Sequence, residues 1–172
     1  MRCFIAIELD NDYFRELQNN IKEHIKGTFP KTFHLTLKFL GEVEDDAVNN
    51  IKETLSNIKF ESFKISLSKI GRFPNENYIR VIWIGLEPKE KIIELQKKID
   101  NELLRLGFKK EKEFEPHLTL ARVKFIKDKI KFNEFIKNIK VEKLEFDFDN
   151  FKLIKSTLTR NGAVYEEIEK YS

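Results

Sequence analysis

The pattern of apolar and polar positions along the chain divides it into short strands and amphipathic helices. Apolar residues recur at every second position in some segments, which predicts strands, and at every third or fourth position in others, which predicts helices. In the first half, strands are predicted at residues 2–9, 34–40 and 63–70, and helices at 10–26 and 46–55. Gly41 is expected to end the second of these strands.

The second half repeats this order of elements. Strands are predicted at residues 78–86 and 117–124, with a helix at 91–106 between them. In each half a strand and a helix precede a second strand that begins with histidine: His34 lies 32 residues after Arg2, and His117 lies 37 residues after Arg80. We infer an internal duplication and an α+β fold of two similar lobes. The tail adds apolar runs at 144–154 and 163–168, the second preceded by a hairpin turn at Arg160, Asn161 and Gly162.

Composition limits the class of protein. The 172 residues carry 32 basic and 29 acidic side chains, a net charge of +3, which suits an acidic substrate bound in a local cleft better than a continuous coat of nucleic acid. No stretch approaches the roughly 20 apolar residues of a membrane span, and the N-terminal apolar run is too short for a signal peptide. The single Cys3 cannot form an internal disulfide. We expect one cytoplasmic domain over residues 1–172, monomeric and not bound to a membrane.

The most specific feature is a tetrapeptide that occurs twice. His34-Leu35-Thr36-Leu37 recurs unchanged 83 positions later as His117-Leu118-Thr119-Leu120, in the corresponding predicted strand of the second half. A single His-x-Thr on a strand is usually structural, because threonine favours strands and histidine is often a satisfied, partly buried group. Two identical copies in duplicated contexts favour a functional site instead.

Strand geometry separates the residue types of this motif. Side chains at positions i and i+2 point to the same face, so each histidine shares a face with its threonine while the leucines face the core. Two imidazoles with an unperturbed pKa near roughly 6.5 can serve as base and acid in phosphoryl transfer to water. Threonine hydroxyls can donate hydrogen bonds to the phosphate oxygens. The third histidine, His24, falls on a predicted helix without this setting and is expected to be a solvated surface residue.

With these motifs the chain resembles the two-histidine (2H) phosphoesterases, in particular the RNA 2',3'-cyclic phosphodiesterases, also called 2'-5' RNA ligases. The likeness spans nearly the whole sequence. It rests mainly on the doubled motif and is supported by Arg-Cys-Phe-Ile-Ala-Ile at 2–7, Gly-Arg-Phe-Pro at 71–74, Arg-Val-Ile-Trp-Ile-Gly-Leu at 80–86 and Ala-Arg at 121–122. The resemblance implies two pseudo-symmetric lobes of antiparallel sheet with outer helices, a cleft between them, and neither metal nor cofactor.

The resemblance also implies roles. His34 is implied as the proton donor and His117 as the proton acceptor, with Thr36 and Thr119 as phosphate ligands. The implied activity is that of a phosphoric diester hydrolase that opens 2',3'-cyclic phosphate ends of RNA or nucleotides to 2'-phosphates, with reversible 2'-5' ligation as a further activity. Arg122 is a candidate phosphate ligand, although its alternation matches Leu118 rather than His117, so a bulge would be needed to bring it to the site.

Two other side chains have two interpretations each. Lys38 shares the predicted face of His34 and Thr36, so it either meets an RNA phosphate or is a solvated lysine. Phe73 either stacks on a base or, more in keeping with a chain of 16 phenylalanines, packs in the core.

Other functions remain open at this point. A metal-dependent hydrolase would need a third ligand, and neither motif contains Asp, Glu or Cys. A non-catalytic module that binds RNA ends would keep the cleft, although two intact motifs argue against it. Within the enzyme class, another cyclic nucleotide or a 2'-5' oligonucleotide presents a similar phosphate to the same site.

Overall fold

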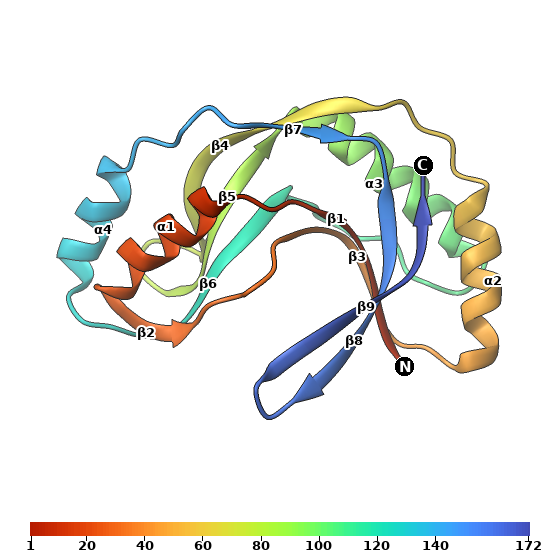
Figure 1. Ribbon diagram of the computed structural model, residues 1–172, viewed down its shortest axis with the longest axis horizontal. Helices are drawn as coiled ribbons and strands as arrows, with labels where there is room; N and C mark the ends of the chain where they lie inside the picture. The colour runs from red at the N-terminus through yellow and green to blue at the C-terminus, as the bar shows by residue number, and fades with distance from the viewer.

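The structure, a computed structural model, describes residues 1–172 as a nine-stranded antiparallel sheet with four helices (Figure 1). This confirms the predicted α+β class. The strands are β1 (Arg2–Glu8), β2 (Ile25–Thr28), β3 (His34–Glu42), β4 (Phe63–Pro74), β5 (Ile79–Glu87), β6 (His117–Ile126), β7 (Glu145–Phe148), β8 (Phe151–Thr159) and β9 (Gly162–Tyr171). The helices are α1 (Asp12–Lys22), α2 (Asp45–Ser56), α3 (Lys89–Leu104) and α4 (Lys129–Asn138).

The order of strands in the sheet reveals two matching lobes. The order is β7-β4-β5-β6-β3-β1-β8-β9, with β2 added on β6, so β3 and β6 meet at the centre. They pair at one position, Leu35 with Leu118, which is the second residue of each motif. Outward from this junction lie β5, β4 and β7 on one side and β1, β8 and β9 on the other. Figure 1 shows α1 and α4 at one end of the arched sheet and α2 and α3 at the other.

Five differences from the sequence prediction concern strand ends and short or mixed segments. Strand β3 continues through Gly41, which was expected to end it, to Glu42. The first helix ends at Lys22, not at residue 26, because β2, which was not predicted, follows it. Gly27 permits this strand to lie against β6, since a Cβ there would be 2.1 Å from the Arg122 carbonyl oxygen. The tail run 144–154 is divided into β7 and β8. Helix α4 was also missed, although Asp128 caps it and it buries two apolar residues one turn apart.

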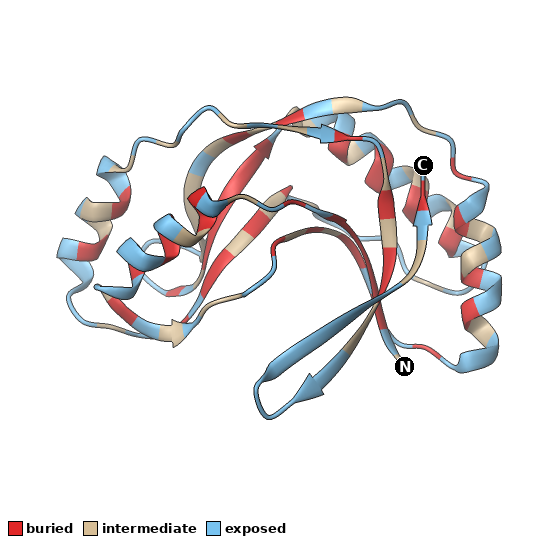
Figure 2. Ribbon diagram, in the orientation of Figure 1, coloured by how far each residue is buried: buried red, intermediate tan, exposed pale blue.

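The helices cover the apolar face of the sheet and cross over between the lobes. Figure 2 shows buried residues along one side of each helix and through the central strands. Helix α1 lies against β6 of the second half, and α3 lies against β3 of the first half. Gln18 of α1 donates through Nε2 to the Leu120 carbonyl oxygen of β6 at 3.0 Å, and this bond is buried. Each lobe is therefore completed by a helix from the other half of the sequence.

Both motif strands contain a β-bulge directly after the threonine. The pairing of β3 with β1 shifts by one residue at Leu37, and the pairing of β6 with β5 shifts by one residue at Leu120. Both strands show two consecutive buried residues at this point. Because a bulge reverses the alternation of faces, Phe39 and Arg122 return to the face of the histidines and threonines. The bulge required to bring Arg122 to the site is present.

The bulge in β3 also decides the place of Lys38. Its side chain is 2% exposed and forms an ion pair with Asp100 of α3 at 2.5 Å. The ammonium group also donates to the Lys109 carbonyl oxygen, and the Asp100 carboxylate accepts bonds from Gln96 Nε2 and the Glu111 backbone N–H. Both interpretations of Lys38, as a phosphate contact and as a solvated lysine, are wrong, because its side chain is buried in this ion pair. The prediction assumed strict alternation and did not include the extra residue of the bulge at Leu37.

The buried pair makes a first prediction about stability. Lys38→Met should lower the free energy of unfolding by about 3–5 kcal/mol, because it leaves the buried Asp100 carboxylate without its cation. Adding Asp100→Asn should recover much of the loss, since the amide is neutral and its oxygen still accepts a hydrogen bond. Urea unfolding of the three proteins measures this difference. Lys52→Met, which removes the more exposed pair with Glu169, is the control and should change little. Equal unfolding midpoints for Lys38→Met and the unmodified protein would contradict the prediction.

Candidate active site

A groove of about 790 Å³ lies over the central strands and is lined from both lobes. This volume falls within the range of small-molecule sites, roughly 300–1,000 Å³. The lining residues include, at equivalent positions of the two motif strands, His34, Thr36 and Phe39 from β3 and His117, Thr119 and Arg122 from β6. The structure thus brings all five predicted site residues to one groove.

The leucines of the motif anchor these strands from the other face. Leu35 and Leu118 are fully buried, and Leu37 and Leu120 are at most 1% exposed. All four belong to the main hydrophobic core. The predicted division of the motif into a polar groove face and an apolar core face is confirmed.

His117 is held in a defined tautomer. Its Nδ1 lies 2.7 Å from the Glu115 carbonyl oxygen, which can only accept, so we assign the proton to Nδ1. In the neutral ring Nε2 then carries a free lone pair. Phe73 packs edge-on at 5.1 Å between ring centroids, with Trp83 at 6.1 Å. Phe73 is half-buried on the groove wall rather than in the core, so the default expectation for it is wrong.

His34 has a different set of neighbours. Its ring packs edge-on against Tyr165 at 5.0 Å and Phe4 at 5.7 Å. Its Nε2 lies 3.7 Å from Oε1 of Glu8, the residue directly opposite it on β1. This distance is an ion-pair contact but exceeds hydrogen-bond length, so an Nε2 proton stays available to a ligand.

Two ion pairs hold the Glu8 carboxylate beside His34. Lys152 Nζ lies 2.8 Å from Glu8 Oε2 and 2.7 Å from Glu167 Oε2, and these contacts connect β1, β8 and β9. The position equivalent to Glu8 in the second half is Gly85, opposite His117. A Cβ at Gly85 would lie 2.3 Å from Ser68 Oγ, so that position has no room for a carboxylate. The two histidines therefore have different residues directly opposite them, a carboxylate for His34 and a glycine for His117.

Burial and these charges act together on the imidazoles. Desolvation lowers the pKa of both histidines below the ordinary value. For His34 the Glu8 carboxylate counteracts this effect, because it favours the protonated ring. For His117 the hydrogen bond to the Glu115 carbonyl and the charge of the Glu115 carboxylate oppose it, whereas the Arg122 guanidinium adds to the lowering of the pKa. Each ring thus has a carboxylate and a cation nearby, but only His34 is in ion-pair contact with its carboxylate.

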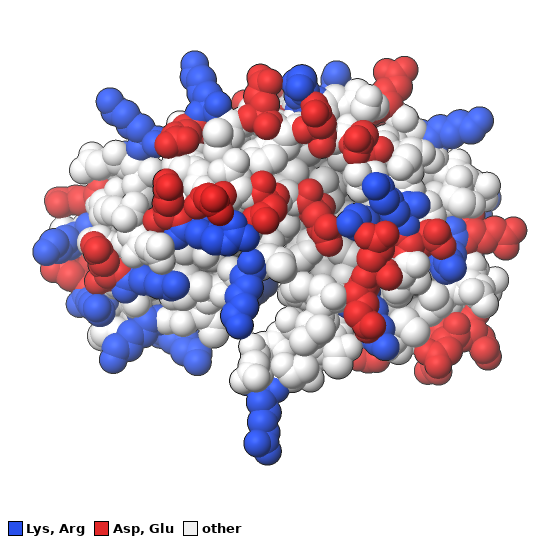
Figure 3. Space-filling model, viewed as in Figure 1, with Lys and Arg blue, Asp and Glu red and all other residues white.

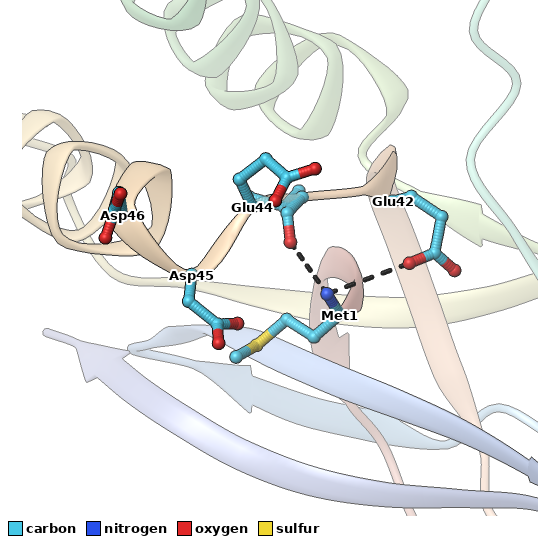
Figure 4. Close-up of a pocket in the computed structure, with 6 residues that line it drawn as sticks. Met1, Glu42, Glu44, Asp45 and Asp46 are labelled. Atoms are coloured by element: carbon cyan, nitrogen blue, oxygen red, sulfur yellow. Dashed lines mark hydrogen bonds and ion pairs between the residues drawn. The ribbon is translucent and has the colours of Figure 1, made fainter.

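The remaining charges do not single out another site. Figure 3 shows lysine, arginine and acidic side chains mixed over the visible face, with a projecting hairpin that is largely uncharged. A second hollow of about 350 Å³ is lined by acidic residues and the N-terminus (Figure 4). There the Met1 ammonium group donates to the Val43 carbonyl oxygen at 2.7 Å and lies 3.7 Å from Glu42, so the chain's own N-terminus offsets part of the negative charge of this hollow.

Three further findings concern possibilities raised from the sequence. His24 lies just beyond α1 and stacks on Phe135 at 4.2 Å, so it is partly covered rather than freely solvated as expected. No group of three His, Cys, Asp or Glu side chains lies close enough together to hold a metal ion. No helix is long and apolar enough to cross a membrane.

A sequence model described as LigT like Phosphoesterase matches the chain twice in tandem, over residues 7–83 and 84–165. The chain belongs to the LigT-like phosphoesterase family. Each match contains one copy of the histidine motif. The resemblance inferred from the motifs is confirmed.

Relatives in this family match over their whole length. A Methanocaldococcus jannaschii protein named RNA 2',3'-cyclic phosphodiesterase is 44% identical over 177 residues, covering 99% of this chain and 100% of its own. A crystal structure of a Thermus thermophilus protein superposes with a TM-score of 0.80 at 27% identity, covering 100% of this chain and 97% of that one. E. coli LigT complexed with 3'-AMP has a TM-score of 0.76 at 23% identity, covering 99% and 96%. These structures share the fold described above.

Sequence reasoning missed three residues of this LigT-like site. Glu8 falls at the end of a predicted apolar strand, and only the register of β1 against β3 places it opposite His34. Phe39 reaches the groove through the bulge, and Tyr165 of the C-terminal hairpin packs against His34. One signal in the sequence could have identified Phe39. When the two His-Leu-Thr-Leu motifs are aligned, Phe39 is the residue equivalent to Arg122, which was already a candidate site residue.

The contact with Glu8 yields a second prediction, which needs no substrate. Glu8→Gln should lower the pKa of His34, because it removes the carboxylate that favours the protonated ring, and should leave His117 unchanged. NMR titration of the imidazole signals measures both values. Glu166→Gln on β9, whose partner is Lys155, is the matched control. A rise in the pKa of His34, or no change, would show that Glu8 does not act on this ring.

Proposed function

We propose that this protein is an RNA 2',3'-cyclic phosphodiesterase, a phosphoric diester hydrolase that opens the cyclic phosphate to a 2'-phosphate. The observation that carries the proposal is the pair of His-x-Thr faces in one groove, where one imidazole is in ion-pair contact with Glu8 and the other is held by a backbone carbonyl oxygen. The names of full-length relatives, among them the one at 44% identity, support the same activity.

The two environments assign the acid and the base. His117, with its proton fixed on Nδ1 and Nε2 free, removes a proton from the attacking water. His34, whose charged form is favoured by Glu8, donates its Nε2 proton to the departing 3' oxygen. As the new P–O bond forms, the P–O3' bond breaks, leaving a 2'-phosphate and a 3'-hydroxyl. The proton taken by His117 and the proton lost by His34 balance, so exchange with solvent restores both rings.

The other groove residues hold the phosphate during this transfer. The hydroxyls of Thr36 and Thr119, one beside each imidazole, donate to the non-bridging oxygens. The Arg122 guanidinium lies on the same face and offsets the negative charge that the phosphorus centre develops. Burial favours the neutral form of His117 by lowering its pKa, and the Arg122 charge adds to this effect, which suits a base.

The proposal extends to substrate and setting. A groove that stabilises this transition state also catalyses the reverse reaction, so 2'-5' ligation of a cyclic phosphate end is the same chemistry run backwards. Other cyclic nucleotides and 2'-5' oligonucleotides are the alternative substrates, and a module that only binds RNA ends is the alternative function. We further propose that residues 1–172 form one domain derived by duplication, monomeric and cytoplasmic, in keeping with the single buried thiol of Cys3.

The assigned roles predict a loss of rate. His34→Ala and His117→Ala should each lower kcat by at least about a hundredfold without unfolding the protein, because general acid or base catalysis is worth roughly 10² to 10⁴. Turnover of an RNA oligonucleotide ending in a 2',3'-cyclic phosphate, followed by identification of the product isomer, measures this. His24→Ala is the matched control and should retain full activity. Near-normal rates in either active-site variant, or binding without turnover by the unmodified protein, would overturn the proposal.

A substrate with sulfur in place of the 3' bridging oxygen separates the two roles. A thiolate leaves without a proton, so His34→Ala should regain much of its lost rate on this substrate, whereas His117→Ala should not. The ratio of rates on the sulfur and oxygen substrates is compared for each variant and for the unmodified enzyme. The opposite pattern would exchange the roles of the two histidines.

The mechanism uses imidazoles alone, which predicts insensitivity to chelators and a bell-shaped dependence of rate on pH. His117 must lose its proton on the acid side and His34 must keep its proton on the alkaline side. Glu8→Gln should move only the alkaline limb, to lower pH, since it lowers the pKa of the acid. Activity that EDTA removes and zinc restores would favour a metal-dependent hydrolase instead.

A further inference from the structure

The β8–β9 hairpin extends beyond the sheet and ends in open solvent. The pairing of β1 with β8 stops at Ser156, whereas β8 and β9 remain paired to their turn at Thr159 and Gly162. All residues from 157 to 167 are exposed. Figure 1 shows this hairpin projecting from the lobe that carries β3 and β1. Nothing in the fold requires the hairpin to be this long, because its tip packs on no other element.

The projecting part of the hairpin differs from the rest of the surface in charge. In a chain that is 35% charged, residues 156–165 contain one charged side chain, Arg160 at the turn, and no carboxylate. Figure 3 shows the hairpin as a largely uncharged projection with a basic group at its end. Leu158 is 69% exposed and Tyr165 is 42% exposed. By strand pairing these two side chains point to the same face.

This face continues into the groove. The Tyr165 ring packs edge-on against His34 at 5.0 Å and lies 5.4 Å from Phe4. Phe4 also lies 6.2 Å from Phe39, which lines the groove and is 65% exposed. The exposed side chains of Phe39 in the groove and of Tyr165 on the hairpin are thus connected through the buried Phe4 ring.

The proposed reaction, on which this inference rests, fixes which part of a substrate lies here. Water attacks from the His117 side, and the 3' oxygen departs on the opposite side, toward His34. The terminal ribose and base are attached to that oxygen, so they lie over the His34 lobe. The rest of an RNA chain continues from the 5' side of this ribose, away from the attacking water. The aromatic face and hairpin are thus next to the nucleotides that precede the cyclic phosphate.

We propose that Phe39, Tyr165, Leu158 and Arg160 form a binding surface for single-stranded RNA upstream of its cyclic end. The aromatic rings offer stacking platforms that accept any base, and Leu158 extends the apolar contact. Arg160 neutralises a backbone phosphate farther along the strand. The absence of carboxylates between Ser156 and Tyr165 removes the repulsion that a polyanion would meet. The preferred substrate is then an RNA strand several nucleotides long rather than a cyclic mononucleotide.

Two substrates test this surface: a nucleoside 2',3'-cyclic monophosphate and a hexanucleotide ending in a 2',3'-cyclic phosphate. The unmodified enzyme should have a kcat/KM at least about tenfold higher for the hexanucleotide, the gain expected from stacking one or two bases. The double variant Leu158→Ala/Arg160→Ala should lower this ratio at least about fivefold, through KM for the hexanucleotide. Val164→Ala changes the opposite face of the same hairpin, where the side chain is 51% exposed, and should leave the ratio unchanged.

The outcomes separate this inference from the proposed function. If the mononucleotide is hydrolysed and the hexanucleotide shows no advantage, the surface is not an RNA site, while the phosphodiesterase activity stands. If neither substrate is hydrolysed, the proposed phosphodiesterase activity is wrong, and fluorescence anisotropy with labelled hexanucleotide tests the binding surface directly. Weaker binding by the double variant would support the surface, and equal binding would overturn it. Sedimentation of a dimer that dissociates in Leu158→Asp would assign the hairpin to a second copy of the chain and overturn RNA binding.

Discussion

The groove depends on one backbone junction between the two lobes. Strands β3 and β6 pair only at Leu35 and Leu118, both fully buried, and diverge on either side. Because each leucine is flanked by a histidine and a threonine, this junction places all four polar side chains on the opposite face, around a common centre. The motif thus has two functions. Its leucines tie the lobes together, and its polar residues face the space that the diverging strands leave open.

Much of this arrangement could be predicted from the sequence, because period-two patterns report which side chains share a face. That reasoning succeeded for the motif residues, His34 to Leu37 and their repeats. It failed at Lys38 and was incomplete at Arg122 for the same reason: one inserted residue reverses the alternation. The repeated motif could have predicted the place of Lys38. If a bulge brings Arg122 into the groove, the equivalent bulge in the other motif strand turns Lys38 toward the core.

Other features depend on contacts between segments that are distant in the chain, and no local pattern reports them. Glu8 acquires its role only through the register of β1 against β3 and through Lys152 on β8. Strand β2 is four residues long and contains Gly27, so its pattern is too short to recognise without its partner. The symmetry of the fold makes such departures informative: Glu8 against Gly85, and Phe39 against Arg122, are the places where two similar lobes acquire unlike chemistry.

The exchange of helices between lobes has a consequence for how such a protein can originate. Helix α1 supplies Gln18 to the bulge of β6, and α3 supplies Asp100 to Lys38 of β3, so neither half contains the helix that covers its own motif strand. A chain of half this length would leave that face bare and could cover it only by exchanging helices with a second copy. The ancestral unit would then be an intertwined homodimer whose symmetry axis passed through the groove, with identical histidines. Under the proposed duplication, fusion into one chain would release the two copies from that identity, so that one histidine could acquire an ion-pair contact, with Glu8, that the other lacks.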